Sequence, residues 1–420
     1  MTLTDHLYSV WLQDRQVGTI HQRGDYTRFT LAEHYRTDPE RAVLGLIFEQ
    51  DLIKPHSALL RLPPWFSNLL PEGAFREWIA DARNVSPHRE MELLAQVGHD
   101  LPGAVRVLPA EEPPDAAGWE RGPHKHEAEI SIGPRDQSPR WRFSLAGVGL
   151  KFSMLAKGDR LTLPASGEGG DWIVKFPDRR YQEVPRNEYT MMSLAGAIGI
   201  EVPKIRLVHR DELDGVPNRV WPNTEEWAYA VRRFDRDDNR RLVHIEDLAQ
   251  VRNFYPDGNP DKYAGNYETV AALIYRRSDV VALREFARRL AFCVLVANGD
   301  AHLKNWSLIY RDPRIPTLSP AYDLAATAPY MEPRDGPEEL ALKFGGSKRF
   351  ETVTLGTFAR LQRRLNAPDA DLADHVADLV KQVRAHWPRY ADQLSCAPTV
   401  RDSVTASIDA RVRSLTGGAR

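Results

Sequence analysis

The most constraining feature of this sequence is a polar stretch of eight residues, Asn-Gly-Asp-Ala-His-Leu-Lys-Asn, at positions 298–305. It follows residues 283–297, whose apolar side chains recur at helical spacing. It precedes two short apolar segments, 308–310 and 316–318, which predict a β-hairpin. Asp323 stands just beyond that hairpin. Helix, polar loop, hairpin and carboxylate thus follow one another along the chain.

That order suits phosphoryl transfer, in which the protein positions the phosphate, holds the metal ion and orients the attacking hydroxyl. Protein kinases use a catalytic-loop Asp, an Asn five positions later and a second metal-binding Asp after a hairpin. Asp300 and Asn305 have that spacing, and Asp323 has that place. Asn305 and Asp323 supply the hard oxygen ligands that Mg²⁺ prefers. Each residue alone is common in turns, so the prediction rests on their combination.

A kinase also needs residues that hold ATP, and the preceding part of the chain offers them. Lys175 stands in the apolar strand 172–176, where a charge is costly without a partner, and Glu188 opens the next predicted helix. The turn at 144–151 contains two glycines that would let backbone N–H groups approach phosphates. Residues 231–234 end the last strand before the helical part, where a hinge would contact adenine. On sequence alone, each residue has an alternative explanation that does not involve ATP. Lys175 could be an ordinary lysine of an edge strand, and Glu188 could be a favourable charge in the first turn of a helix.

Composition narrows the class of protein. The length of 420 residues exceeds that of one ordinary domain. The charges nearly balance, with 56 Lys plus Arg against 58 Asp plus Glu, which gives no general reason to expect avid nucleic-acid binding. Two cysteines are too few for a disulfide framework or a thiolate zinc site. The apolar runs are far shorter than the ~18 residues of a membrane span, and the N-terminus lacks a signal-peptide core. We therefore expect a cytoplasmic protein without membrane contact.

The order of the predicted elements, strands and one helix followed mostly by helices, indicates a bilobal α+β arrangement. We expect an N-terminal β-containing subdomain over residues 1–110, which begins with a hairpin. A Pro-rich linker is predicted over 111–135. A strand-rich lobe that would hold ATP follows over 136–234, and a mostly helical lobe over 235–420.

Several segments of the chain resemble the HipA-like serine/threonine kinase toxins of bacterial toxin–antitoxin systems, in the family's order and over nearly the whole chain. These segments lie at 66–73, 97–104, 143–148, 151–152, 233–236, 298–305 and 320–323. The most specific are Arg-Phe-Asp-Arg at 233–236 and the polar stretch at 298–305. The resemblance implies an atypical protein-kinase-like fold with an extra N-terminal subdomain, and it implies ATP and Mg²⁺ at the site.

The resemblance also implies roles for individual residues. Asp300 would be the catalytic base, Asn305 and Asp323 would hold Mg²⁺, and Ser144 matches the serine that family members autophosphorylate. A phosphate on Ser144 adds ~−1.5 to −2 charges beside the phosphate loop, so repulsion would push that loop out and switch the kinase off. The residues implied in ATP binding are Ala146, Gly147, Val148, Gly149, Leu150, Lys151, Lys175, Arg232, Arg233, Phe234, His302, Leu303, Lys304, Asn305, Tyr322 and Asp323.

Two positions depart from the family's pattern. Gly149 stands where relatives often carry Gln, and the looser loop would weaken ATP affinity. Arg232 stands where many relatives carry Glu at the first hinge position. A hinge that acts through backbone groups would be little changed, whereas one that uses the acidic side chain would have an altered nucleotide preference.

The resemblance implies partners as well. Family substrates include aminoacyl-tRNA synthetases, whose phosphorylation halts translation. The usual partner is a small helix-turn-helix antitoxin, HipB-like, through which most contact with operator DNA is made, in agreement with the near-neutral charge of −2. We therefore expect a toxin kinase that transfers the γ-phosphate of ATP to a protein substrate and to its own Ser144.

Two other functions stay open on sequence. One is a kinase-like scaffold that acts as a co-repressor with a DNA-binding antitoxin and transfers little phosphate. The other is a metallohydrolase using Asp300, His302 and Asp323, although His302 has no second histidine at helical metal-ligand spacing. The interleaved Arg and Asp residues at 232–241 predict a solvated mixed-charge surface.

Overall fold

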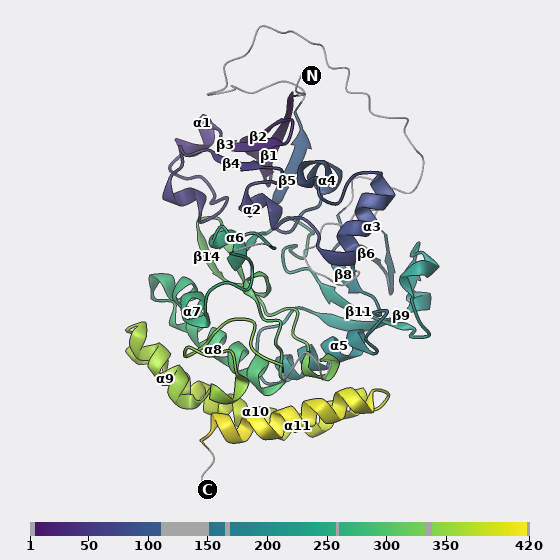
Figure 1. Cartoon of the computed structure of the whole chain (residues 1–420), viewed down its shortest axis with the longest axis vertical. Coiled ribbons are helices and arrows are strands. Elements are labelled where there is room, and N and C mark those ends of the chain that lie inside the picture. Colours follow the sequence, from purple (N-terminus) through teal and green to yellow (C-terminus); the bar gives the residue numbers. More distant parts are fainter. Residues whose placement is uncertain (1–4, 111–150, 164–168, 258–259, 332–337, 418–420) are drawn as a thin grey trace.

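The computed structural model describes residues 5–110, 151–163, 169–257, 260–331 and 338–417. It is an α+β fold that extends from a sheet containing β1 at one end to a layer of helices containing α11 at the other (Figure 1). The predicted linker at 111–135 and the predicted phosphate turn up to residue 150 lie outside the described residues.

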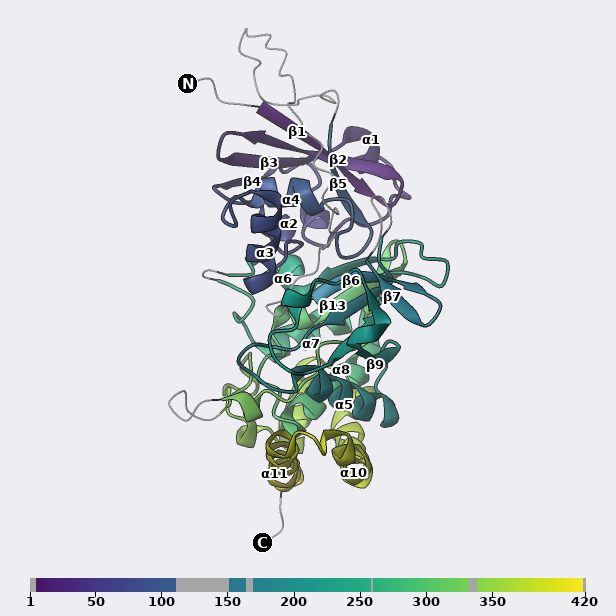
Figure 2. The same ribbon diagram turned by 90° about the vertical axis from the view of Figure 1, so that its right-hand side faces the viewer.

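The N-terminal part is a five-stranded antiparallel sheet in the order β4–β3–β2–β1–β5, and α2, α3 and α4 lie on the side that faces the rest of the molecule (Figures 1 and 2). Its strands are β1 (Asp5–Leu12), β2 (Arg15–Arg23), β3 (Tyr26–Leu31), β4 (His56–Leu59) and β5 (Val105–Pro109). Its helices are α1 (Glu33–Arg36), α2 (Pro64–Ser67), α3 (Gly73–Arg83) and α4 (Glu90–Val97). The hairpin predicted at the start of the chain is confirmed as β1 and β2.

The middle part is a six-stranded sheet in the order β10–β7–β6–β8–β11–β9, antiparallel except for the β10–β7 pair. Its strands are β6 (Lys151–Lys157), β7 (Arg160–Thr162), β8 (Trp172–Lys175), β9 (Ile205–His209), β10 (Leu213–Asp214) and β11 (Trp227–Arg232). Side chains of β11 alternate between two hydrophobic cores. Ala228 and Ala230 join the core of the N-terminal part, whereas Tyr229 and Val231 join the core that contains α5 (Val184–Ala197) and the C-terminal helices.

The register of this sheet brings two lysines together. Lys175 of β8 lies opposite Lys151 of β6 on one side and opposite Tyr229 of β11 on the other. Residues directly opposite in a sheet present their side chains on the same face. Because Tyr229 belongs to the core of α5 and the C-terminal helices, both lysines point toward the C-terminal part.

The C-terminal part combines a three-stranded sheet, in the order β12–β13–β14, with helices. The strands are β12 (His244–Asp247), β13 (Ser307–Asp312) and β14 (Ile315–Leu318). The helices are α6 (Leu248–Val251), α7 (Tyr267–Tyr275), α8 (Val280–Leu295), α9 (Leu355–Arg364), α10 (Leu372–Ala391) and α11 (Pro398–Leu415). Buried α8 packs against α7, α10 and α11, and α10 and α11 lie side by side in both views (Figures 1 and 2). The predicted hairpin after the polar loop is confirmed as β13 and β14.

The prediction that residues 232–241 form a solvated surface is wrong for the first half of the segment. The side chains of Arg233 and Arg236 are 0% and 4% exposed. Each guanidinium group pairs with Asp100 of the N-terminal part and with Asp235. Interleaved opposite charges can meet in the interior as well as in solvent, and the sequence pattern does not distinguish the two.

The Arg233 guanidinium donates hydrogen bonds to residues of three segments of the chain. Its Nε and Nη2 donate to Asp235 at 2.9 and 2.8 Å, and its Nη1 donates to Asp100 Oδ1 at 3.0 Å and to Ser153 Oγ at 3.1 Å. The backbone N–H of Gly103 also donates to Asp235, at 2.8 Å. This network ties the N-terminal part to β6 and to the chain that leaves β11.

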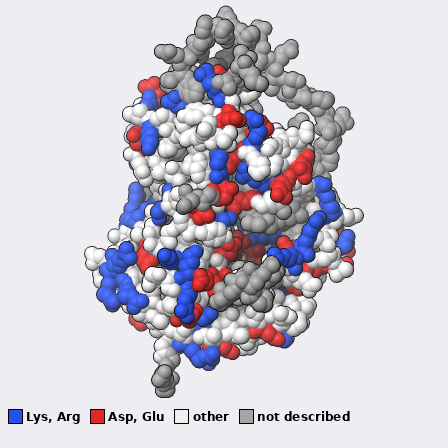
Figure 3. All heavy atoms as spheres, viewed as in Figure 1, with Lys and Arg blue, Asp and Glu red and all other residues white. Residues whose placement is uncertain are grey.

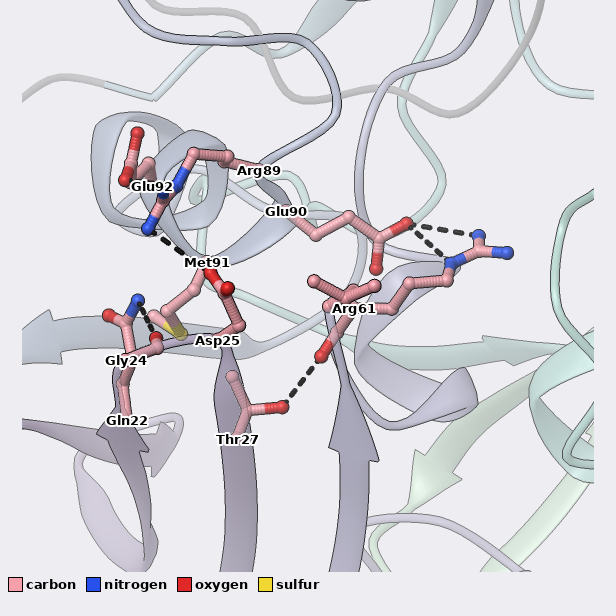
Figure 4. A pocket seen from close by; sticks show the side chains of 10 residues that line it. Gln22, Gly24, Asp25, Thr27, Arg61, Arg89, Glu90, Met91 and Glu92 are labelled. Carbon is pink, nitrogen blue, oxygen red and sulfur yellow. Dashed lines mark hydrogen bonds and ion pairs between the residues drawn. The ribbon is translucent and has the colours of Figure 1, made fainter.

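A second junction between the N-terminal and C-terminal parts lies at Arg61 (Figure 4). Its guanidinium donates to buried Glu90 at 3.0 and 3.2 Å, pairs with Asp257 and lies 4.1 Å from the ring centroid of Tyr255. The hollow beside this group has a volume of only about 20 Å³. That is room for about one water molecule, so this hollow is a packing feature and not a ligand site.

The surface carries no face of a single charge in the view of Figure 3, where basic and acidic side chains are interspersed around a central hollow. This agrees with the net charge of −2. Within the described part of the chain, none of the helices combines the length and the apolar character that crossing a membrane requires.

We predict that Asp235→Asn lowers the free energy of unfolding by about 3–5 kcal/mol at pH 7, because two buried guanidinium groups lose a counter-charge. Burial alone would raise the pKa of Asp235, but Arg233 and Arg236 lower it to about 2. The stabilisation by a carboxylate with a lowered pKa is present above its unfolded pKa of ~3.9 and is lost as the pH falls through its folded pKa. The difference between wild type and variant should therefore shrink as the pH falls below about 4. Urea unfolding at several pH values measures it.

Asp402→Asn in α11 is the matched control, since Asp402 is 68% exposed and pairs with Arg401 on the surface. This substitution should change the free energy of unfolding by less than ~1 kcal/mol at any of these pH values. Equal effects of the two substitutions would contradict a stabilising role for the buried network.

Candidate active site

A cavity of about 300 Å³ lies where the middle sheet, the C-terminal part and the N-terminal part meet. The sequence-predicted residues that line it are Lys151, Lys175, Arg232, Arg233, Phe234, Asp300, His302, Lys304, Asn305, Tyr322 and Asp323. Ser144 and residues 146–150 lie outside the described residues, and the side chain of Leu303 lies in the hydrophobic core. The fold thus gathers most of the predicted residues into one cavity.

The centre of the cavity is an ammonium group held between two carboxylates. Lys175 Nζ donates to Glu188 Oε1 of α5 at 2.6 Å and also bonds Asp323, which follows β14. Burial would lower the pKa of Lys175, but Asp323 and Glu188 raise it, so the ammonium form is favoured. The partner that a charge in an apolar strand requires is therefore present, so Glu188 is more than a favourable charge near the start of α5.

The pKa values of the two carboxyl groups shift in opposite directions. Burial raises the pKa of Glu188 to about 7, against the opposing effect of Lys175. Burial would also raise the pKa of Asp323, but Lys175 and Lys151 hold it well below its usual range. Lys151 itself has its pKa lowered to about 8 by burial and by the nearby Lys175. The ionised form of Asp323 is therefore favoured at neutral pH.

The polar loop, residues 298–305, is held by its own side chains. Asn298 Oδ1 accepts the backbone N–H of Asp300 at 2.9 Å, and Asn305 Nδ2 donates to the backbone carbonyl of Asp300 at 2.7 Å. These bonds leave the Asp300 side chain half-exposed at the cavity. Burial raises the pKa of Asp300, and His302 opposes that shift.

Gly299 is required in this loop by the close approach of another segment. A Cβ at this position would lie 1.9 Å from Glu338 Oε1 and 2.5 Å from the backbone oxygen of Glu339. The Gly299 N–H also donates to Thr327 Oγ1 at 2.7 Å. The chain beyond Asp323 is thus packed directly on the polar loop.

Asn305 and Asp323 have the chemistry to hold a divalent cation. The Asn305 amide nitrogen is used by Asp300, which leaves its carbonyl oxygen for a cation, and the Asp323 carboxylate is ionised. Both line the cavity, and Mg²⁺ takes one or two such protein ligands together with phosphate oxygens and water. Among the described residues, no group of three or more His, Cys, Asp or Glu side chains is arranged around a metal position, so the metallohydrolase hypothesis gains no support.

At the end of β11, two backbone N–H groups and one guanidinium group already have hydrogen-bond partners within the protein. The backbone N–H groups of Arg232 and Arg233 donate to the carbonyls of Lys204 and Asp171, at 2.8 and 2.9 Å. The Arg233 guanidinium is used in the buried network described above. The ring of Phe234 faces that of Tyr322 with centroids 5.5 Å apart, and both line the cavity. A contact to adenine at this edge would therefore fall mainly to Phe234 and the carbonyl groups.

The N-terminal part contributes residues that sequence reasoning did not assign to the site. Glu72, which precedes α3, pairs with Lys262 and, at 3.2 Å, with Lys304. Lys304 Nζ also donates to the backbone oxygen of Asn68 at 2.7 Å. Burial would raise the pKa of Glu72, but the two lysines lower it to about 2. Asn68 and Glu72 lie in the segment 66–73, which carries part of the family resemblance. The sequence therefore marks this segment, but it does not show that the segment contacts Lys304.

A lysine–glutamate pair, an Asp–Asn loop and a second Asp around one cavity define a kinase-like protein. Comparison with protein-family models identifies the family to which this chain belongs. The model of the HipA N-terminal domain matches residues 8–108, and the model of the HipA-like C-terminal domain matches residues 143–387. The chain belongs to the HipA-like kinase family, as the sequence motifs predict.

Individual relatives agree. The chain is 40% identical over 389 residues to a Sinorhizobium fredii protein that carries the name "Putative kinase Y4dM", covering 90% of each chain. It is 24% identical over 335 residues to the serine/threonine-protein kinase toxin HipA of Shewanella oneidensis, covering 73% of this chain and 72% of the relative. The solved complex of Shewanella oneidensis HipA, HipB and operator DNA contains a chain of the same fold, with a TM-score of 0.72 and 20% identity over 98% of this chain and 97% of that chain.

We predict that Gly299→Ala destabilises the protein by about 1–3 kcal/mol, because the backbone of Glu339 must shift to admit a methyl group. Gly356→Ala, in α9, is the matched control, since its nearest neighbours stand at an ordinary 3.5 Å and Ala favours a helix. Urea unfolding should show a loss for the first variant and no loss for the second. Two equally stable variants would contradict the close packing on the polar loop.

Proposed function

We propose that this protein is an ATP-dependent serine/threonine protein kinase that acts as the toxin of a toxin–antitoxin module. The observation that carries the proposal is the convergence on one cavity of the Lys175–Glu188 pair, Asp323, Asp300 and Asn305. The α+β fold shared with Shewanella oneidensis HipA supports it. We include in the proposal two kinase-like lobes, divided near residue 234, and an extra N-terminal subdomain.

Each of these residues has a role in the proposed reaction. Asp300 accepts the proton of the acceptor hydroxyl as the acceptor oxygen bonds to the γ-phosphorus. The bond from that phosphorus to the β–γ bridging oxygen breaks, and ADP leaves. When Mg²⁺ is bound, Asn305 and Asp323 would hold it, and it would supply positive charge that neutralises the phosphate oxygens.

Lys175 and Lys151 recognise the phosphates in this proposal. The Lys175 ammonium is shared by Glu188 and Asp323. Phosphate oxygens can replace Asp323 as its counter-charge while Glu188 keeps the side chain in place. Asp323 is then released for the metal ion. Phe234, Tyr322, His302 and the backbone of residues 232–234 complete the ATP site in this proposal, and the family resemblance adds residues 146–150 to it.

The partners follow from what the relatives are known to assemble with. Shewanella oneidensis HipA is found in a complex with HipB and operator DNA. We propose a HipB-like antitoxin for this chain, with DNA contact mainly through that partner. We further propose a translation factor such as an aminoacyl-tRNA synthetase as protein substrate, and Ser144 as the site of autophosphorylation.

We predict that Asp300→Asn reduces ATP-dependent phosphorylation by ~10²–10⁴, because removing a positioned base costs that much. The full-length chain is incubated with γ-labelled ATP and a cell lysate, and phosphorylated proteins and Ser144 are identified by mass spectrometry. Asp14→Asn, on the exposed turn between β1 and β2, is the matched control and should leave the rate unchanged. A wild-type chain that transfers no phosphate would favour the co-repressor scaffold instead.

We predict that Lys175→Met weakens ATP binding by ~10–100-fold, since a hydrogen bond between charged groups is worth ~1.5–3 kcal/mol. Isothermal titration of the purified chain with Mg²⁺·ATP measures the affinity. Lys157→Met, at the exposed end of β6, is the control and should bind as wild type does. Equal affinities of all three proteins would remove Lys175 from the ATP site.

A further inference from the structure

Tyr263 reaches Asp300 from a segment outside the polar loop. Its hydroxyl donates to Asp300 Oδ1 at 2.9 Å. The ring packs edge-on against His302, with centroids 5.1 Å apart. Tyr263 is 39% exposed, and it contacts two residues that line the cavity, Asp300 and His302. Neither composition nor motif marks this tyrosine, which lies in the irregular segment before α7.

The contacts of Asp300 are made at one of its two carboxylate oxygens. Tyr263 Oη bonds Oδ1, and His302 Nε2 lies 3.8 Å from the same atom. Within the residues that the structure describes, no hydrogen bond reaches Oδ2. A carboxylate that serves as a base needs one oxygen free for the incoming hydroxyl, and Oδ2 meets that need.

Tyr263 is itself held in place from both sides. Its backbone N–H donates to Asp261 Oδ1 at 2.9 Å. The carbonyl of Lys262 accepts the N–H of Leu303 at 3.0 Å, which ties this segment to the polar loop. The Lys262 ammonium pairs with Glu72 and lies 5.7 Å from the centre of the Tyr263 ring. These contacts hold the backbone at Tyr263 against the polar loop and place the Lys262 ammonium beside its ring.

We propose that Tyr263 is a positioning residue for phosphoryl transfer: its hydroxyl holds Asp300 through Oδ1 and so presents Oδ2 to the acceptor hydroxyl. The inference rests on the proposed kinase function. In the transfer, the proton of the acceptor hydroxyl passes to Oδ2, the acceptor oxygen bonds to the γ-phosphorus, and ADP leaves with the electron pair of the broken P–O bond. Tyr263 keeps its own proton throughout.

The test is Tyr263→Phe in the full-length chain, which keeps the ring against His302 and removes only the hydroxyl. Transfer of γ-³²P from ATP is measured to the chain itself and to dephosphorylated casein. The maximal rate should fall by ~10–100-fold, the loss expected for one hydrogen bond to a charged group. The KM for ATP should change by less than twofold, and the urea midpoint should stay at the wild-type value. Tyr255→Phe is the matched control, because the Tyr255 ring lies over Arg61, whose partners are Glu90 and Asp257 and not Asp300.

A double-mutant cycle separates positioning from a general structural effect. If Tyr263 acts through Asp300, then Tyr263→Phe in the Asp300→Asn chain should change the residual rate by less than twofold. A full loss in that background overturns the inference, and so does a wild-type rate in the single variant. A faster single variant overturns it as well and identifies Tyr263 as a blocking group. Absence of transfer by the wild-type chain overturns the proposed function and the inference together.

Discussion

The site depends on one partly buried ammonium group, Lys175, shared between Glu188 and Asp323. A lone charge at this depth would be costly, and two carboxylates without it would repel each other. The sheet register sets the position of Lys175 beside Lys151, α5 supplies Glu188, and the chain after β14 supplies Asp323. Three segments of the fold are thus held at one point by electrostatics. The same three charges can be redistributed when phosphate oxygens offer a new counter-charge, which makes the group suited to binding ATP.

The N-terminal part is joined to this site by buried ion pairs, in addition to the apolar core that it shares with the middle sheet. Arg233 and Arg236 are buried against Asp100, so the chain leaving β11 is fixed to the segment before β5. Glu72 and Asn68 hold Lys304, the neighbour of Asn305 in the polar loop. A buried ion pair broken on one side is strongly destabilising. The N-terminal part therefore stabilises the positions of the polar loop and of the edge of the cavity.

Sequence reasoning works where the partners are close in the chain. The spacing of Asp300 and Asn305 is local, and helical or alternating periodicity predicts α5, α8 and the strands around Lys175 from neighbouring residues alone. It fails where partners are distant. Lys304 and Asn68 are 236 positions apart, and Arg233 and Asp100 are 133 apart, so no local pattern pairs them. The role of Tyr263 cannot be predicted from the sequence for the same reason, because its contact with Asp300 forms only when two irregular segments pack together.

We propose that these side chains surround the phosphates of ATP and a magnesium ion. A crystal structure of the chain with Mg²⁺ and a non-hydrolysable ATP analogue tests this arrangement most directly. We expect oxygens of Asn305 and Asp323 at ~2.0–2.1 Å from the ion, with the Lys175 ammonium bonded to phosphate oxygen and to Glu188. A nucleotide bound outside this cavity, or an ion that neither residue ligates, would contradict it.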